Sequence, residues 1–213
     1  MGGMHKIIEG FEQVAREQGV KIITDNEVLS TNSENGKITS LECKNGRIES
    51  DIFISGADYE HTDQQLLKEK SNYSEKYWDK RTMAPSCLLF YVGIDRKVDH
   101  LKHHNLFFDA PFHQHAVEIY KDPSWPSSPL FYVCCPSKTD PSVAPEGHEN
   151  MFFLIPLAPD LKDDADKREE YFELLLERIK ERTGEDLKPN IVFKRSYCID
   201  DFKADYHAYK GNA

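Results

Sequence analysis

The segment from residue 129 to residue 159 constrains the fold of this chain more than any other. Two apolar runs, at 130–135 and 151–159, flank a polar connection that is rich in proline, serine, aspartate and glycine. Apolar runs bounded by turn residues and rich in aromatic and β-branched side chains are typical of buried strands. Three prolines, at positions 136, 141 and 145, restrict the backbone of the connection, which can therefore be long and still ordered. We predict two neighbouring core strands joined by a rigid loop.

Further runs in the same part of the chain extend this sheet. Short apolar runs predict strands at 86–94, 106–108, 117–120 and 191–193. Their connections are short or contain proline, which favours an antiparallel or mixed sheet over repeated βαβ units. The apolar positions between 165 and 183 fall on one helical stripe, with Asp163 or Asp164 as the N-cap and Gly184 at the C-terminal end. This helix should cover one face of the sheet, and residues 196–213 should form an irregular tail.

The first part of the chain has a different pattern. Apolar side chains recur with helical spacing from 4 to 18, just before Gly19, and predict a surface helix with one buried face. Strands are expected at 20–23, 27–32, 37–43 and 48–54, and the hairpin turns of a meander at Asn35-Gly36 and Asn45-Gly46. The apolar run 52–54 predicts a strand buried on both faces, as in a parallel sheet. Helical pieces at 60–68 and 74–80 lead to the larger sheet.

The turn Ser55-Gly56-Ala57-Asp58, which follows this run, is the first candidate ligand site. Small residues at the carboxyl end of a buried strand allow the backbone to approach a ligand closely. The alternative is an ordinary turn from strand to helix, in which Asp58 is the N-cap of the helix. The residues alone leave both interpretations open.

Composition argues against some classes of function. The 213 residues carry a net charge of −10, so a nonspecific nucleic-acid surface, which requires clustered Lys and Arg, is not expected. No segment has the roughly 18 apolar residues of a membrane span, and no signal-peptide pattern is expected. Peripheral membrane contact stays open. Five cysteines without paired spacing indicate a reducing compartment, so we expect a cytoplasmic protein, with peripheral contact to the cytoplasmic membrane left open.

Histidine and cysteine are the side chains that most suggest a chemical role. Histidines gather at positions 100, 103, 104, 113 and 115. No carboxylate or cysteine completes a metal-ligand set at standard spacing, so no metal site is predicted, and we assign these histidines to hydrogen bonds at strand and loop ends. Cys134 and Cys135 are adjacent on a strand and should point to opposite sides, which excludes a paired-thiol site. The sequence also lacks the motifs G-x-S-x-G, G-x-x-x-x-G-K and G-x-G-x-x-G.

Several stretches resemble one known family. They are GGMHKIIEGFEQVAREQGV at 2–20, SGAD at 55–58, NYSEKYWDKRTMAPSCLLFYVGI at 72–94, HHNLFF at 103–108, PLFYVCCPSKTDPSVAPEGHENMFFLIPLAP at 129–159 and DFKADYHAYKGNA at 201–213. The loop TDPSVAPEG at 139–147 is the most specific of them. Through these stretches the chain resembles bacterial phytoene desaturases (phytoene dehydrogenases), the FAD-dependent carotenoid desaturase family, in the form found in Bacteroidetes.

The resemblance implies part of a flavin oxidoreductase that desaturates CH–CH bonds of a C40 carotenoid precursor, phytoene or a derivative. Family members begin with G-x-G-x-x-G and end with a flavin-contacting segment. The expectation is therefore a fragment without either part, which neither retains FAD nor is active alone. The implied partners are a hydrophobic polyene and, in the intact enzyme, quinone or oxygen as electron acceptor. The alternatives are a carotenoid isomerase or saturase on the same scaffold, and a non-enzymatic binding or escort module.

The expected fold class is α/β (α+β). It combines a mixed, largely antiparallel sheet of a flavoprotein substrate domain, with helices on one face, and an excerpt of the FAD domain made of a helix and a β-meander. On the resemblance, residues 1–58 are the excerpt of the FAD-binding domain and 59–85 a helical connection. Residues 86–195 form the substrate domain, and 196–213 a tail that returns toward the FAD domain.

The resemblance also implies cofactor contacts. Val28 resembles the position whose backbone meets the adenine of FAD, and Gly56 and Ala57 resemble the turn that approaches the cofactor. Gly2, Gly3 and Met4 resemble the segment that lines the flavin ring region. Gly211 and Asn212 resemble the tail that leads into the flavin segment. No catalytic residue is implied. The aromatic side chains that either line a polyene tunnel or pack in the core are Phe107, Phe108, Phe131 and Phe153.

Overall fold

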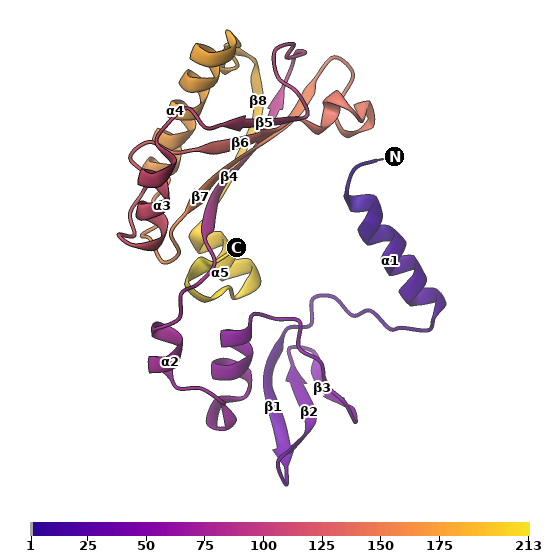
Figure 1. The fold of residues 1–213 in the computed structure, drawn as a ribbon. Helices are drawn as coiled ribbons and strands as arrows, with labels where there is room; N and C mark the ends of the chain where they lie inside the picture. Colours follow the sequence, from indigo (N-terminus) through magenta and orange to yellow (C-terminus); the bar gives the residue numbers. More distant parts are fainter. Residues whose placement is uncertain (1) are drawn as a thin grey trace.

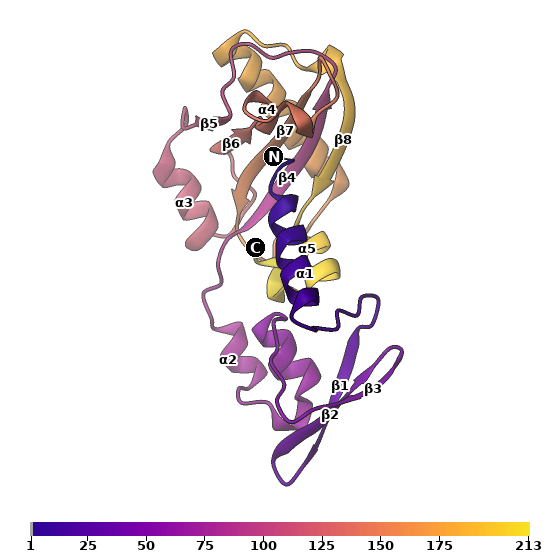
Figure 2. The ribbon, with the colours of Figure 1, turned by 90° about the vertical axis from the view of Figure 1, so that its right-hand side faces the viewer.

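The computed structural model describes residues 2–213, apart from the side chain of Glu69, and shows an elongated molecule with two sheets (Figures 1 and 2). The larger sheet and its helices lie at one end, the smaller sheet lies at the other, and short helices connect them. Every strand pair of the described residues is antiparallel. This architecture confirms the predicted fold class of a largely antiparallel sheet with helices, together with a helix and a β-meander.

The larger sheet has five strands, in the order β5 (His104–Phe107), β6 (Phe131–Cys134), β7 (Glu149–Leu157), β4 (Ser86–Ile94) and β8 (Ile191–Tyr197). The two longest, β4 and β7, pair without interruption from Ser86 opposite Leu157 to Ile94 opposite Glu149. The predicted strands at these places are confirmed, and β8 is longer than expected. The predicted long connection between β6 and β7 folds into two 3₁₀ turns, Pro136–Lys138 and Pro141–Val143.

One face of this sheet packs against the helix α4 (Ala165–Thr183), as predicted. Burial alternates along β7, so successive side chains point into this core and away from it. Its most deeply buried members, each at most 2% exposed, include Leu88, Phe90, Ile94, Met151, Phe153, Ile155, Leu157, Phe172, Leu175 and Ile179. Each such side chain stabilises the fold by about 1.5–3 kcal/mol through burial. The predicted ends of α4 are also confirmed, because Asp164 caps its first turn and Gly184 is left-handed at φ 78°.

Two segments of the larger part differ from the prediction. The expected strand at 117–120 is wrong, because these residues belong to the helix α3 (Phe112–Tyr120). Four residues are too few to distinguish the two-residue period of a strand from the 3.6-residue period of a helix. The expected irregular tail contains the helix α5 (Ile199–Tyr206), which a reciprocal capping pair of Cys198 and Asp201 begins.

The meander is confirmed, with strands β1 (Val28–Glu34), β2 (Lys37–Cys43) and β3 (Gly46–Glu49). The strand expected at 20–23 is absent from the described residues, where that segment has no regular secondary structure and no sheet partner. The expected strand buried on both faces is also wrong, because Ile52 and Ile54 are 78% and 92% exposed. A strand needs at least one hydrogen-bonded neighbour, and no described strand pairs with residues 52–54.

The first helix, α1 (His5–Glu17), confirms the predicted helix but not its buried face. Its apolar stripe, Met4, Ile7, Ile8, Phe11 and Val14, is 56–84% exposed. Periodicity therefore predicted the helix and its apolar stripe correctly. The expected packing of this stripe against another element is not found among the described residues.

The connecting helices are a π-helical turn (His61–Leu66), a 3₁₀ turn (Lys68–Lys70) and α2 (Glu75–Asp79), close to the predicted pieces. The buried carboxylate of Asp63 joins them. It accepts hydrogen bonds from the backbone N–H of Asn72 at 2.6 Å and from the indole N–H of Trp78 at 3.1 Å. Burial by itself raises the pKa of Asp63, but these donors outweigh it and lower the pKa.

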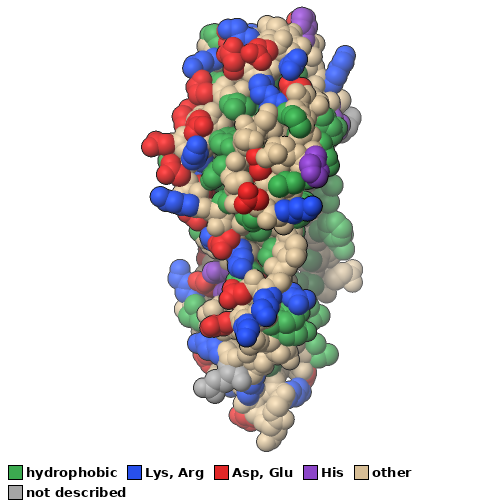
Figure 3. All heavy atoms as spheres, turned by 60° about the vertical axis from the view of Figure 1, so that its left-hand side comes forward, with side chains coloured by type: hydrophobic (Ala, Val, Ile, Leu, Met, Phe, Trp, Pro, Cys, Tyr) green, Lys and Arg blue, Asp and Glu red, His purple; other side chains and the backbone are tan. Residues whose placement is uncertain are grey.

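Surface charge and helix hydropathy are the last features of the fold. Figure 3 shows the side of the molecule that carries α3 and α4, where acidic and basic side chains are interspersed. Among the described residues, no helix is both long enough and apolar enough to span a membrane.

A second buried carboxylate holds the β6–β7 connection. Glu149, at the start of β7, is 2% exposed, accepts a hydrogen bond from the Ser137 hydroxyl and pairs with Lys138 Nζ at 3.1 Å. Burial by itself raises the pKa of Glu149, but the bonds from Ser137 and Lys138 outweigh burial, and the pKa is lowered.

We therefore expect Glu149→Gln to lower the free energy of unfolding at neutral pH by about 1–3 kcal/mol, because it removes the charge that these donors stabilise. A carboxylate whose folded-state pKa is lowered stabilises the protein above its unfolded pKa, about 4.3, and this contribution is lost as pH falls through the folded-state value. The difference between parent and variant should thus shrink below about pH 4. Urea denaturation across this pH range measures it, with the exposed Glu146→Gln as the control. A constant difference would contradict the assignment.

Candidate functional site

The face of the larger sheet opposite α4, which we call the open face, is also apolar. The strand register places on it Cys87, Leu89, Tyr91, His104, Leu106, Tyr132, Cys134, Phe152, Leu154, Pro156, Phe193, Arg195 and Tyr197. Phe202 of α5 covers one end, where it packs near Cys87, Leu89 and Tyr197. Elsewhere the described residues leave it accessible, and Tyr91, Phe193 and Leu106 are 41%, 55% and 66% exposed. A sheet face of this composition normally has a partner.

Aromatic rings run across the middle of the open face. The rings of Tyr91 and Phe152 are 5.4 Å apart, and those of Phe152 and Tyr132 are 6.5 Å apart, so the row crosses three adjacent strands. Burial, together with the neighbouring Cys134, raises the pKa of Tyr132 to about 12, so its hydroxyl is neutral at physiological pH. This surface can bind and orient a flat hydrocarbon by burial, and it offers few groups for acid or base chemistry.

An apolar groove of about 370 Å³ continues from the open face. Leu106, Tyr132, Leu154 and Pro156 of the sheet form one wall. The other wall comes from α3 and the residues before it, namely Phe108, Phe112, Ala116, Ile119 and Tyr120. The volume is within the range of small-molecule sites.

His115 fixes α3 beside the sheet and lies at this groove. Its Nδ1 accepts a hydrogen bond from the backbone N–H of Leu130 at 3.1 Å, so Nε2 carries the proton and donates to the carbonyl of Pro156 at 2.9 Å. Both ring nitrogens are thus used by the backbone. The prediction that the histidines of this region serve hydrogen bonding is confirmed for His115, whose role is structural.

The structure brings four of the predicted cofactor contacts together. Val28, Gly56 and Ala57 line one cavity of about 460 Å³ between the meander and the turn. Gly56, Ala57 and Asn212 line a neighbouring cavity of about 540 Å³ between the turn and the C-terminal segment. His207 borders both. Residues far apart in sequence therefore meet around the turn at 55–58.

Asp58 is the link at this junction. Its Oδ1 accepts from the backbone N–H of Glu60 at 2.9 Å and of His61 at 3.2 Å, which confirms that Asp58 caps the following helix. Its Oδ2 accepts from the N–H of Tyr209 at 3.3 Å, which holds the C-terminal segment against the turn. The rings of His61 and His207 also stack, with centroids 4.1 Å apart.

The other predicted contacts lie elsewhere. The N–H groups of Gly2 and Gly3 donate to Asp140 Oδ2 at 2.9 and 3.2 Å, so this segment sits against the β6–β7 connection, away from the turn (Figure 1). The Ser142 hydroxyl and these two N–H groups hold the pKa of Asp140 well below its usual range. Met4 is 84% exposed. Gly211 is buried against Ile199 and lines neither cavity.

Several features of the site were not predicted from the sequence. Of the four candidate tunnel aromatics, Phe107, Phe131 and Phe153 are core residues at most 8% exposed, although Phe131 also borders the groove, and Phe108 is 63% exposed in the groove. The rings of the open face, Tyr91, Tyr132 and Phe152, are the sequence neighbours of core residues. Both faces of β4 and β7 are apolar, so the sequence shows no alternation that would tell the two faces apart. Spacing along the sequence also could not show that the pairing of β5 with β6 brings Cys134 beside His103 and His104.

The fold is also found in solved structures of other proteins. It is similar to a solved oxidoreductase from Methanosarcina mazei, with a TM-score of 0.66, 22% identity, and coverage of 92% of this chain and 42% of that one. A solved protein from Pyrococcus furiosus gives a TM-score of 0.58 at 17% identity, over 90% of this chain and 41% of that one.

Sequence comparison is more specific, although no family model matches the chain. The chain is 37% identical over its whole length to the carotenoid 3,4-desaturase of Haloarcula japonica. It is 30% identical over 99% of its length to the 4,4'-diapolycopene oxygenase of a Methylomonas species, and 34% identical over 76% to the phytoene desaturase of Fusarium fujikuroi. Its homologues are thus carotenoid desaturases and oxygenases and phytoene desaturases. The chain spans only part of the length of these relatives: 43% of the Haloarcula and Methylomonas proteins and 29% of the Fusarium protein.

Two glycines of the predicted site, Gly56 and Gly211, should differ in how far an added methyl group destabilises the protein. A Cβ on Gly211 would lie 2.5 Å from Ile199 Cγ2 and 2.7 Å from its carbonyl oxygen, at a φ of +64°. A Cβ on Gly56 would meet no described atom within 4 Å. We expect Gly211→Ala to destabilise the protein by about 2–4 kcal/mol and Gly56→Ala to change stability by less than about 0.5 kcal/mol. Thermal unfolding of both variants measures this, and equal melting temperatures would show that Gly211 is not a packing position.

Proposed function

We propose that this chain is the substrate-facing part of an FAD-dependent oxidoreductase that desaturates a carotenoid precursor, phytoene or a derivative. One observation carries the proposal: the larger sheet keeps an accessible aromatic face, continuous with an apolar groove, in a chain whose homologues are carotenoid desaturases and oxygenases. A polyene has almost no polar handles, so burial against flat rings is the main way to bind and orient it.

Within this proposal the described residues fit only part of the cofactor. The turn at Gly56 and Ala57 borders two cavities and presents a bare backbone, which suits close contact with a planar group. The sequence has no G-x-G-x-x-G loop, so nothing in these residues matches a pyrophosphate site at a helix N-terminus. When bound, FAD would accept the hydride that leaves the hydrocarbon. The chain itself would bind the polyene, orient it and exclude water.

The remaining expectations are part of the same proposal. The partners would be a hydrophobic polyene and quinone or oxygen as electron acceptor, and residues 1–58 and 86–195 would belong to the FAD-binding and substrate domains. Delivery of a membrane-dissolved substrate favours a cytoplasmic protein in peripheral contact with the cytoplasmic membrane.

A second candidate activity is oxidation of a carotenoid end group by the same scaffold. The similarity to a 4,4'-diapolycopene oxygenase over 99% of the chain favours it. Product analysis of the full-length protein with C40 and C30 polyenes separates the two activities, because desaturation adds double bonds and oxygenation adds oxygen.

We expect the 213-residue chain, expressed alone, to purify without flavin, because it has no pyrophosphate loop. Visible absorption and flavin fluorescence of the denatured protein report the cofactor. A yellow preparation with stoichiometric flavin would contradict this expectation.

The open face can be tested in the full-length enzyme with Tyr91→Glu. A carboxylate at the β4 end of the ring row would have to be desolvated beside a hydrocarbon, so product formation should fall about tenfold or more. Leu29→Glu is the matched control, since Leu29 is 53% exposed on β1 and lines neither the groove nor the two cavities. Equal product formation by both variants, at equal melting temperature, would remove the open face from the substrate site.

A further inference from the structure

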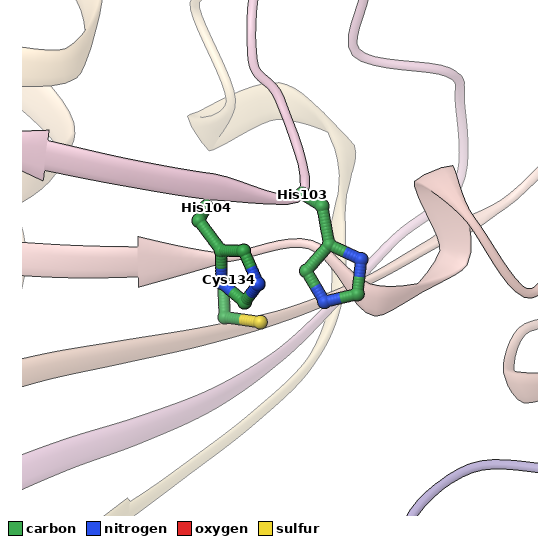
Figure 4. Close-up of side chains that lie close together, drawn as sticks. All are labelled: His103, His104 and Cys134. Carbon is green, nitrogen blue, oxygen red and sulfur yellow. The ribbon is translucent and has the colours of Figure 1, made fainter.

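Two histidines and one cysteine gather at one corner of the larger sheet (Figure 4). The register of β5 and β6 places His104 directly opposite Cys134. His103 lies in the bend that precedes β5, where strict alternation does not apply, so its ring turns to the same side and lies 4.2 Å from that of His104. One donor atom from each of the three side chains lies within 4.8 Å of the others.

The two rings are already oriented as ligands. Nδ1 of His103 hydrogen-bonds the Thr139 hydroxyl, and Nδ1 of His104 hydrogen-bonds the Tyr132 hydroxyl, both at 2.6 Å. In the tautomer that carries the proton on Nδ1, each ring donates this bond and keeps the lone pair of Nε2. Within the described part of the chain, neither Nε2 has a hydrogen-bond partner. Metal-binding histidines in proteins are oriented in this way.

We propose that His103, His104 and Cys134 bind a zinc ion, with solvent as the fourth ligand. Imidazole and thiolate are the ligands that zinc prefers, and a combination of two nitrogens and one sulfur suits its tetrahedral geometry. In such a site the donor atoms are about 3.3 to 3.6 Å apart, so the side chains need to close by about 1 Å. His104 is exposed and the other two are half-buried, which leaves an open path for the ion and its solvent ligand.

Zinc at this corner would join three separate segments. His104 starts β5, with His103 in the bend just before it, and Cys134 ends β6, while the hydrogen bond to Thr139 reaches the β6–β7 connection. Asp140 of the same connection holds Gly2 and Gly3. Because the unfolded chain does not assemble the three ligands, the ion would stabilise the folded corner and thus the edge of the open face. This inference does not depend on the proposed enzymatic function.

Cobalt titration of the reduced chain tests the site directly. Co²⁺ should bind at one equivalent with a thiolate-to-metal charge-transfer band and the visible bands of a tetrahedral complex, and Zn²⁺ should displace it. The other four cysteines are buried, so the band reports Cys134. Cys134→Ser should abolish the band. His104→Ala removes a ligand, so it should weaken binding by more than the roughly 10- to 100-fold that loss of a ligand's hydrogen-bond partner causes. The control His113→Ala removes an exposed histidine of α3 and should bind as the parent does.

Thermal unfolding with Zn²⁺ gives an independent measurement. The parent and His113→Ala should gain melting temperature, and Cys134→Ser, His103→Ala and His104→Ala should gain much less. Cobalt binding without a charge-transfer band, or zinc affinity that is unchanged in Cys134→Ser and His104→Ala, would overturn the proposal. If one variant fails to fold, the other two decide the result.

Discussion

The pairing of β4 with β7 creates a sheet that is apolar on both faces, and only one of them is covered by a long helix. The covered face, with α4, forms a core of closely packed side chains that are almost fully buried. The open face keeps large apolar side chains accessible, although burying them would stabilise the fold. In a stable protein such a surface is maintained for contact with something else, and the row of rings across its centre indicates what kind of molecule fits.

A second organising point is the turn at 55–58. It receives the meander on one side and the C-terminal segment on the other, and Asp58 bonds both the following helix and Tyr209. The two cavities around it share the backbone of Gly56 and Ala57 and the ring of His207. The turn, the helix that follows it and the C-terminal segment are thus joined through the carboxylate of Asp58.

Errors in the predicted elements have specific physical causes. Residues 52–54 have the composition of a buried parallel strand, but a strand forms only where neighbours supply hydrogen bonds, and the described residues supply none. Residues 117–120 contain strand-favouring side chains, yet they continue a helix whose inner side is fixed to the sheet through His115. In both places tertiary contacts, rather than local propensity, determine the conformation.

By itself, the sequence determined the features that depend on local chemistry. These are the helices 5–17 and 165–183 with their ends, the meander with its glycine turns, the central strands, and the resemblance that relates the chain to carotenoid desaturases. Only the tertiary structure decided which face of the sheet remained accessible. It also decided that Val28 and Asn212 each line a cavity with Gly56, while Gly2 and Gly3 line neither, and that Cys134 lies beside His103 and His104. Such relations depend on strand register and on contacts between residues far apart in the chain, and a one-residue change in register would reverse every side chain of a strand.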